Sequence, residues 1–162
     1  MIGARARQAL PWFGVAAVVI VLDRITKTLV LQSVAPGETV VLGSFLNLVL
    51  VFNKGAAFSF LAGASGWQSG FFAAVAAIAS VVITVLIVRH PANRLLAAGL
   101  ALILGGALGN LWDRLAWGQV VDFVDVHAAG WHWPAFNVAD SGITIGAALL
   151  ILESFLRRDA GG

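Results

Sequence analysis

Residues 39–61, TVVLGSFLNLVLVFNKGAAFSFL, decide how many times this chain crosses a membrane. The stretch is apolar enough to span a bilayer, which takes about 20 helical residues. Gly43 and Gly55 interrupt it, however, and its valines favour strand over helix. We therefore expect a small β-structure here, lying on the outer membrane surface, rather than a spanning helix.

Four other apolar stretches have the length of membrane-spanning helices: residues 11–31, 70–88, 95–112 and 138–156. Only 11% of the residues are charged, against about a quarter in a soluble domain. We interpret the first stretch as a retained helix rather than a signal peptide, because Asp23, Arg24 and Lys27 follow its apolar part. The predicted fold is an all-α membrane protein with a small β element: one domain over residues 1–162, with four transmembrane helices and the β-structure between the first two.

The arginines favour four spans over five. With the N-terminus inside, four spans place all six flanking arginines in the cytoplasm, whereas five would put the last four outside: Arg5, Arg7, Arg89, Arg94, Arg157 and Arg158. Both termini are then cytoplasmic, and residues 39–61 and 116–137 lie at the outer face. The net charge is +2, but the basic residues form no single patch, so we expect no nucleic-acid partner.

Two aspartates near the C-terminus stand among apolar residues, Asp122 in the segment VVDF and Asp140 in FNVADS. A carboxylate at a membrane boundary is costly, and by default it marks function. Two that meet are the minimal equipment of an aspartic protease. Spacing alone leaves Asp125 as a rival, and leaves open that Asp122 faces water and that Asp140 only completes a helix cap begun by Asn137.

The end of the third apolar stretch gathers polar groups on one helix face. Asn110, Asp113, Arg114 and Trp117 follow the spacing i, i+3, i+4, i+7. This pattern is typical of an internal salt bridge with an interfacial tryptophan. We interpret Asp113 and Arg114 as bracing a site rather than reacting in it.

Three further features of the sequence predict packing or local structure. Asp23 and Lys27 are four residues apart in the first helix and should pair locally, in a structural role. Asn53 precedes Gly55, where small residues allow close backbone approach or a simple turn. The Gly-x-x-x-Gly spacing of Gly105 and Gly109 favours close helix packing.

The sequence gives little support for a metal site or for covalent catalysis by a nucleophilic side chain. The chain has no cysteine, hence no thiolate nucleophile or cysteine-based metal site. His127 and His132 match no His-Glu-x-x-His pattern, and Ser141 has no lysine near it in sequence. We expect no metal and no organic cofactor.

Five segments together resemble the lipoprotein signal peptidase (signal peptidase II) family of bacterial membrane aspartic proteases. They occur in the family's order: LDRITK (22–27), NKGAAFS (53–59), GGALGNLWDR (105–114), VDF (121–123) and FNVADS (136–141). The match runs nearly end to end, and its one departure is Trp112, where tyrosine is common. The resemblance implies a location in the bacterial cytoplasmic (inner) membrane, with the active site at the extracytoplasmic face.

The resemblance also implies an activity and residue roles. Family members remove the signal peptide from diacylglyceryl-modified prolipoproteins, before the lipidated cysteine, and are the target of globomycin. Asp122 and Asp140 match the catalytic pair, and this choice over Asp125 comes from the family. Positions that line or support the family's site are matched by four residues: Asn53, Asn110, Arg114 and Asn137. A structural role is implied for Asp23 and Lys27.

Two other function classes stay open from the residues alone. Intramembrane charges also mark a small proton-coupled transporter, although polar groups gathered at one face do not outline a path through the membrane. A lipoprotein-binding assembly factor would use the same polar cluster for recognition only. In each case we expect a monomer in contact with membrane lipids.

Overall fold

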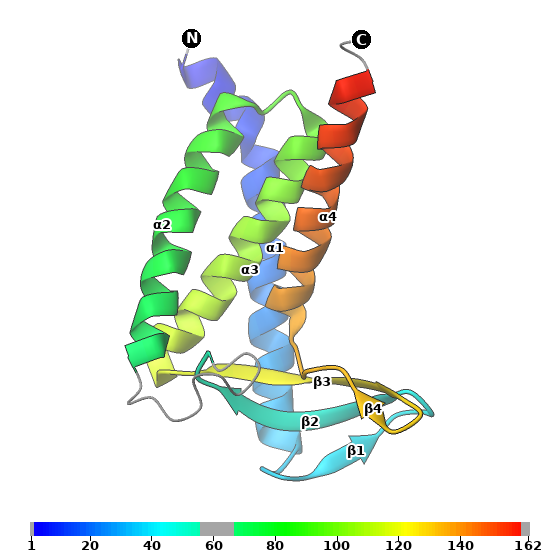
Figure 1. Ribbon diagram of the computed structural model, residues 1–162. Coiled ribbons are helices and arrows are strands. Elements are labelled where there is room, and N and C mark those ends of the chain that lie inside the picture. The colour runs from blue at the N-terminus through cyan, green and yellow to red at the C-terminus, as the bar shows by residue number, and fades with distance from the viewer. Residues whose placement is uncertain (1, 56–66, 160–162) are drawn as a thin grey trace.

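The computed structural model describes residues 2–55 and 67–159 (Figure 1). In this part of the chain four helices run side by side, and a small antiparallel sheet closes one end of the bundle. The helices are α1 (Ile2–Ser33), α2 (Trp67–Arg89), α3 (Arg94–Trp117) and α4 (Val138–Asp159). The first residues of α1 and the last of α4 lie at the end of the bundle away from the sheet.

Three helices of the described residues are long and apolar enough to cross a membrane: α2, α3 and residues 138–157 of α4. The helix α1 is not among them by length and composition, although it packs in the same bundle. It begins well before Pro11, which lies inside the helix rather than at its start, because the residues that precede it are mostly good helix formers. The third helix, α3, is longer than the sequence predicts at its C-terminal end: it reaches Trp117 rather than residue 112. It stops at Gly118, whose φ of 70° is left-handed.

Glycines allow α3 to lie at the centre of the bundle, in contact with the other three helices. A methyl group on Gly105 would lie 2.7 Å from the carbonyl oxygen of Ala16 in α1. One on Gly109 would lie 2.9 Å from Oδ2 of Asp23. The spacing of these two glycines therefore serves close packing of α3 on α1, as the sequence predicts.

Two apolar clusters lie along α1, with polar groups between them. The first contains Ala9 and Ala16 with side chains of α2 and α3, and the second joins Val30 and Val34 to the sheet. Between Ala16 and Val30 the helix carries Asp23, which is fully buried. Asp23 is thus enclosed near the level at which the helix bundle meets the sheet.

The sheet is larger than the sequence predicts. Its order is β1 (Thr39–Val41), β2 (Leu46–Asn53), β3 (Val120–Ala128), β4 (Trp131–His132), all antiparallel. We expected a β-structure from residues 39–61 alone, of which 56–61 lie outside the described residues. The second outer loop supplies β3 and β4, and the ladder between β2 and β3 shifts register between Leu48 and Val51. Such irregularities re-aim side chains, and here Asp122 pairs with Val51 just beyond the shift.

Candidate active site

Asp122 lies on β3 with only 2% of its surface exposed. Its two carboxylate oxygens accept hydrogen bonds from two amides: Nδ2 of Asn53 at 2.9 Å and Nδ2 of Asn137 at 2.7 Å. Burial raises the pKa of Asp122 to about 6, because it disfavours the charged form, and the nearby Asp140 carboxylate adds to this. The two amide hydrogen bonds act in the opposite direction. This carboxyl therefore binds a proton far more readily than an aspartate in water.

Asp140 lies in the first turn of α4, and Asn137 precedes that helix. The backbone N–H of Asp140 donates to Oδ1 of Asn137 at 2.9 Å, and the backbone N–H of Asn137 donates to Oδ2 of Asp140 at 3.3 Å. This is a reciprocal capping arrangement, so Asp140 does complete the cap. Its other oxygen, Oδ1, accepts a hydrogen bond from Nδ2 of Asn110 at 2.8 Å.

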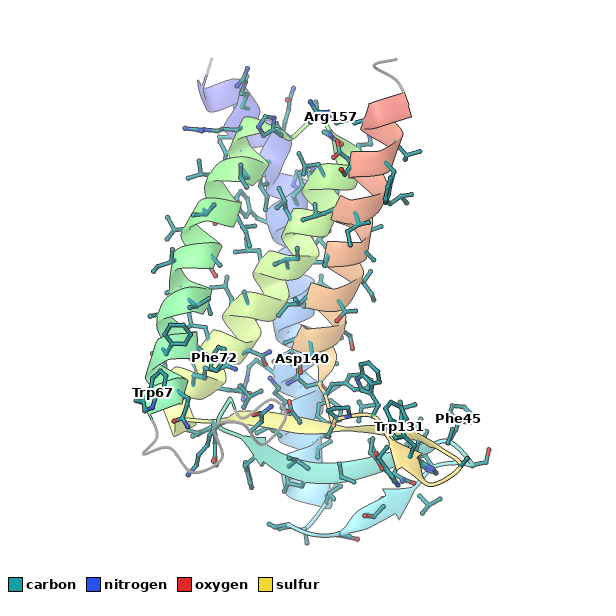
Figure 2. The ribbon with its side chains drawn as sticks, viewed as in Figure 1. Phe45, Trp67, Phe72, Trp131, Asp140 and Arg157 are labelled. Carbon is teal, nitrogen blue, oxygen red and sulfur yellow. The ribbon has the colours of Figure 1, made fainter. Side chains whose placement is uncertain are left out.

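Asn137 joins the two aspartates. Its side-chain Nδ2, fully buried, donates to Asp122 and lies 3.3 Å from Oδ1 of Asn110, while its backbone N–H donates to Asp140. The two carboxylates therefore converge on one asparagine from a strand and a helix that are remote in sequence. Figure 2 shows Asp140 at the foot of α4, where the helices meet the sheet.

Arg114 lies beside this pair. Its Nη1 donates to the carbonyl oxygen of Asn110 at 3.3 Å, and its guanidinium lies 5.5 Å from the ring centre of Phe72. The buried Nε has no hydrogen-bond partner among the described residues. The arginine is close enough to interact electrostatically with Asp140 and Asp122. The guanidinium therefore places a positive charge beside the two carboxyls.

A buried ion cluster holds the elements of the site together, with Lys27 at its centre. Its Nζ lies 2.8 Å from Asp23, 2.8 Å from Asp113 and 3.0 Å from Oδ1 of Asn110. Asp23 and Asp113 also accept backbone hydrogen bonds, from Ala139 in α4 and from Val121 in β3. The cluster thereby fixes α1, α3, α4 and β3 relative to one another.

Sequence reasoning missed two contacts of this cluster and its surroundings. Arg24 pairs with Asp113 and lies 4.9 Å from the ring centre of Trp117. Arg24 follows Asp23 directly and lies three residues before Lys27. This helical spacing was the signal in the sequence that Arg24 could join the cluster. Gly55, with φ of 96°, donates its N–H to Oδ1 of Asn53 at 2.8 Å, and a methyl group there would lie 2.5 Å from Phe72. This contact orients the amide that binds Asp122.

Asp125, the rival candidate, has different partners. It accepts a hydrogen bond from Nδ2 of Asn47 at 2.8 Å and lies 2.8 Å from Nδ1 of His132. Asp122 and Asp125 are three residues apart on one strand, so alternation directs them to opposite faces. The structure brings Asp122, and not Asp125, into hydrogen-bonded contact with the residues that hold Asp140. Among the described residues no group of three His, Asp or Glu is arranged to hold a metal ion.

Two solved bacterial membrane enzymes have folds similar to that of this chain. One such structure superposes with a TM-score of 0.80 at 31% identity, covering 93% of this chain and 90% of the other. A second gives a TM-score of 0.78 at 32% identity, covering 88% and 91%. The chain thus has the fold of a class of helical membrane enzymes with a small sheet at one end.

Comparison with sequence families identifies the particular family. The family model described as "Signal peptidase (SPase) II" matches residues 15–156. A lipoprotein signal peptidase of Janthinobacterium sp. (strain Marseille) is 53% identical, over 91% of this chain and 90% of the relative. One of Paraburkholderia phytofirmans is 54% identical, over 93% and 87%. The chain belongs to the signal peptidase II family.

Proposed function

We propose that this chain is a membrane aspartic endopeptidase that removes the signal peptide from diacylglyceryl-modified prolipoproteins, cutting before the lipidated cysteine. Membership of the signal peptidase II family supports the class of substrate. The observation that carries the catalytic assignment is the convergence of Asp122 and Asp140 on Asn137. The apolar helices fit a bacterial inner membrane protein.

The roles of the two carboxyls follow from their surroundings. Burial raises the pKa of Asp122, so this residue holds the shared proton. Asp140 accepts hydrogen bonds from the side chain of Asn110 and from the backbone of Asn137, and we assign it the role of general base. Two carboxyls that share one site cannot both ionise readily, so one of them keeps a proton.

Catalysis then needs no metal or organic group. Asp140 takes a proton from the attacking water, and Asp122 donates its proton to the developing oxyanion of the scissile carbonyl. Asp140 then passes the proton taken from water to the leaving amine nitrogen as the C–N bond breaks. The tetrahedral intermediate returns a proton to Asp122 as its carbonyl re-forms, which restores the starting pair. General acid and base steps of this kind each contribute about 10²–10⁴-fold. The Arg114 guanidinium stabilises negative charge that develops at the pair.

The topology proposed with this function has four spans, with α1 as the first, and both termini in the cytoplasm. The sheet lies at the extracytoplasmic surface. Exposed aromatic side chains support a position of the sheet at a membrane surface, because tryptophan and other aromatics gather at both membrane interfaces, and the arginines assign the side. Figure 2 shows Phe45, Trp67 and Trp131 near the level of the sheet, and each is more than half exposed.

The proposal is tested by purifying the protein in detergent and supplying a diacylated prolipoprotein. We expect a product that begins at the lipidated cysteine, and inhibition by globomycin. Asp122→Asn and Asp140→Asn should each abolish the product, while Glu38→Gln, an exposed acid on the loop before β1, should not. Cleavage that survives in both asparagine variants would contradict the assignment. Proton flux without proteolysis would instead support a transporter, and binding without turnover an assembly factor.

A further inference from the structure

A hollow of about 550 Å³ lies beside Asp140, on the side of α4 that faces the hairpin formed by β3 and β4. Asp140 and Ser141 contribute its polar part. The remaining lining is almost entirely apolar: Val126, Trp131, Trp133, Phe136, Thr144 and Ile145. We call this hollow the α4 groove. Its volume falls within the range of about 300–1,000 Å³ that is typical of ligand pockets.

Two tryptophans form the outer wall of the α4 groove, and little secondary structure supports them. Trp131 and Trp133 pack edge to face, with ring centres 5.7 Å apart, and both are more than half exposed. Trp131 belongs to β4, a strand of two residues that pairs with β3, and Trp133 follows that strand directly. The turn before β4 has positive φ at Ala129 and Gly130, as in type I′ hairpins. A hairpin of this length is marginal without further contacts.

Two further contacts hold this segment. The backbone N–H of Trp133 donates to the carbonyl oxygen of Val126 in β3 at 2.8 Å, and the side chain of His132 contacts Asp125. Nδ1 of His132 lies 2.8 and 3.0 Å from the two carboxylate oxygens of Asp125, which also accepts a hydrogen bond from Asn47 on β2. The His132 ring stacks on that of His127, with centres 5.0 Å apart. These contacts join β4 to β3 and β2. Because His132 lies between the two tryptophans in sequence, its contacts hold residues 131–133 to the sheet.

We propose that His132 is a positioning residue, whose contact with Asp125 holds Trp131 and Trp133 in place so that the α4 groove receives one alkyl chain of the lipidated substrate. The inference rests on the proposed function and names the substrate part that this groove binds. It is distinct from the catalytic pair, because His132 acts through the tryptophans and touches no reacting atom.

The size and chemistry of the α4 groove decide its occupant. The apolar part of a signal peptide has about 7–15 residues, which as a helix is roughly 10–22 Å long and about 10–12 Å across. Such a helix occupies more volume than the hollow of about 550 Å³, whereas a single alkyl chain is slender enough to enter. The indole and aliphatic lining matches an alkyl chain. Because Asp140 lines the same hollow, a chain bound there stays next to the scissile bond.

The test measures KM and kcat with two substrates that differ only in acyl length, palmitoyl or butyryl. For the wild type we expect a lower KM with palmitoyl chains. His132→Phe, which keeps a ring but loses the contact with Asp125, should raise the palmitoyl KM about tenfold, equivalent to 1.4 kcal/mol. The butyryl KM and both kcat values should stay within about twofold. His132→Asn places an amide donor near the Nδ1 position and should restore the palmitoyl KM.

Further variants keep the test decisive if His132→Phe fails to fold. Trp133→Ala and Ile145→Trp should each raise the palmitoyl KM selectively, the first by removing a wall and the second by filling the groove. Trp112→Ala is the matched control, because Trp112 is exposed on α3 and does not line the groove. Equal KM changes for both substrates, or none, would overturn the inference while leaving the peptidase intact. Absence of any cleavage by the wild type would overturn the proposed function, and the inference with it.

Discussion

Amide side chains hold the two candidate catalytic carboxyls. Asn53 and Asn137 donate to Asp122, and Asn110 donates to Asp140. Amides supply fixed hydrogen-bond donors without adding a positive charge, so the pair can keep one proton. A lysine or arginine in direct contact with Asp122 would favour ionisation and remove that proton.

The pH dependence of activity tests this arrangement through Asn53. Its hydrogen bond favours the ionised form of Asp122, so Asn53→Ala should raise the pKa of that residue above its value of about 6. The form that donates a proton is present below the pKa and is lost as the pH rises through it. The alkaline limb of kcat/KM should therefore move to higher pH in the variant. A limb that stays in place, or moves to lower pH, in a folded variant would contradict the role given to Asp122.

The ion cluster around Lys27 is tested by stability. Lys27→Met would leave the fully buried Asp23 and Asp113 without their shared cation. Breaking a buried ion pair in this way costs about 3–5 kcal/mol, so thermal unfolding in detergent should occur at a clearly lower temperature. Lys54→Met, at an exposed lysine, is the matched control and should leave the unfolding temperature nearly unchanged. Equal unfolding temperatures for the two variants would show that the ion cluster does not stabilise the fold.

At the scale of elements, α3 is the helix on which the others pack, and glycines set its distance from α1. Gly105→Ala tests this directly, because the added methyl group would meet the backbone of Ala16, which cannot rotate away. We expect a loss of about 1–3 kcal/mol, the range for overpacking. Gly14→Ala on α1 is the control, since nothing lies within 4 Å of its added methyl group, and helix propensity then favours alanine by about 1 kcal/mol. A variant at Gly105 as stable as the one at Gly14 would show that the close approach is not required.

The helices were predictable from sequence to a greater extent than the sheet. Long apolar runs identify helices locally, and capping by Asn137 follows from one residue type at one position. The pairing of β2 with β3 joins residues about seventy positions apart, and its register depends on an irregularity near Leu48 that no local pattern marks. For the same reason the link from Asn53 to Asp122 was not foreseen from spacing. The His132 contact with Asp125 also depends on strand pairing.

At the scale of the whole molecule, the sheet and the free ends of the bundle lie at opposite ends (Figure 1). The proposed topology places the sheet outside the cell membrane and both termini inside. Because the chain has no cysteine, single cysteines can be introduced and labelled without background. Ser44→Cys, on the exposed turn between β1 and β2, should react with a membrane-impermeant thiol reagent added to intact spheroplasts. Gly3→Cys, near the start of α1, should react only after lysis, and the reverse pattern would contradict the topology.

The turnover of Asp122→Asn, Asp140→Asn and the double variant shows whether the two aspartates act as one catalytic unit. Residues that act as one proton-sharing unit lose their function together, so their effects do not multiply. We predict that each single change lowers kcat by at least about 10²–10⁴-fold, the contribution of a general acid or base, and that the double variant is no slower than the worse single one. A single variant that keeps wild-type turnover, or losses that multiply in the double variant, would show that the two aspartates do not work as a pair.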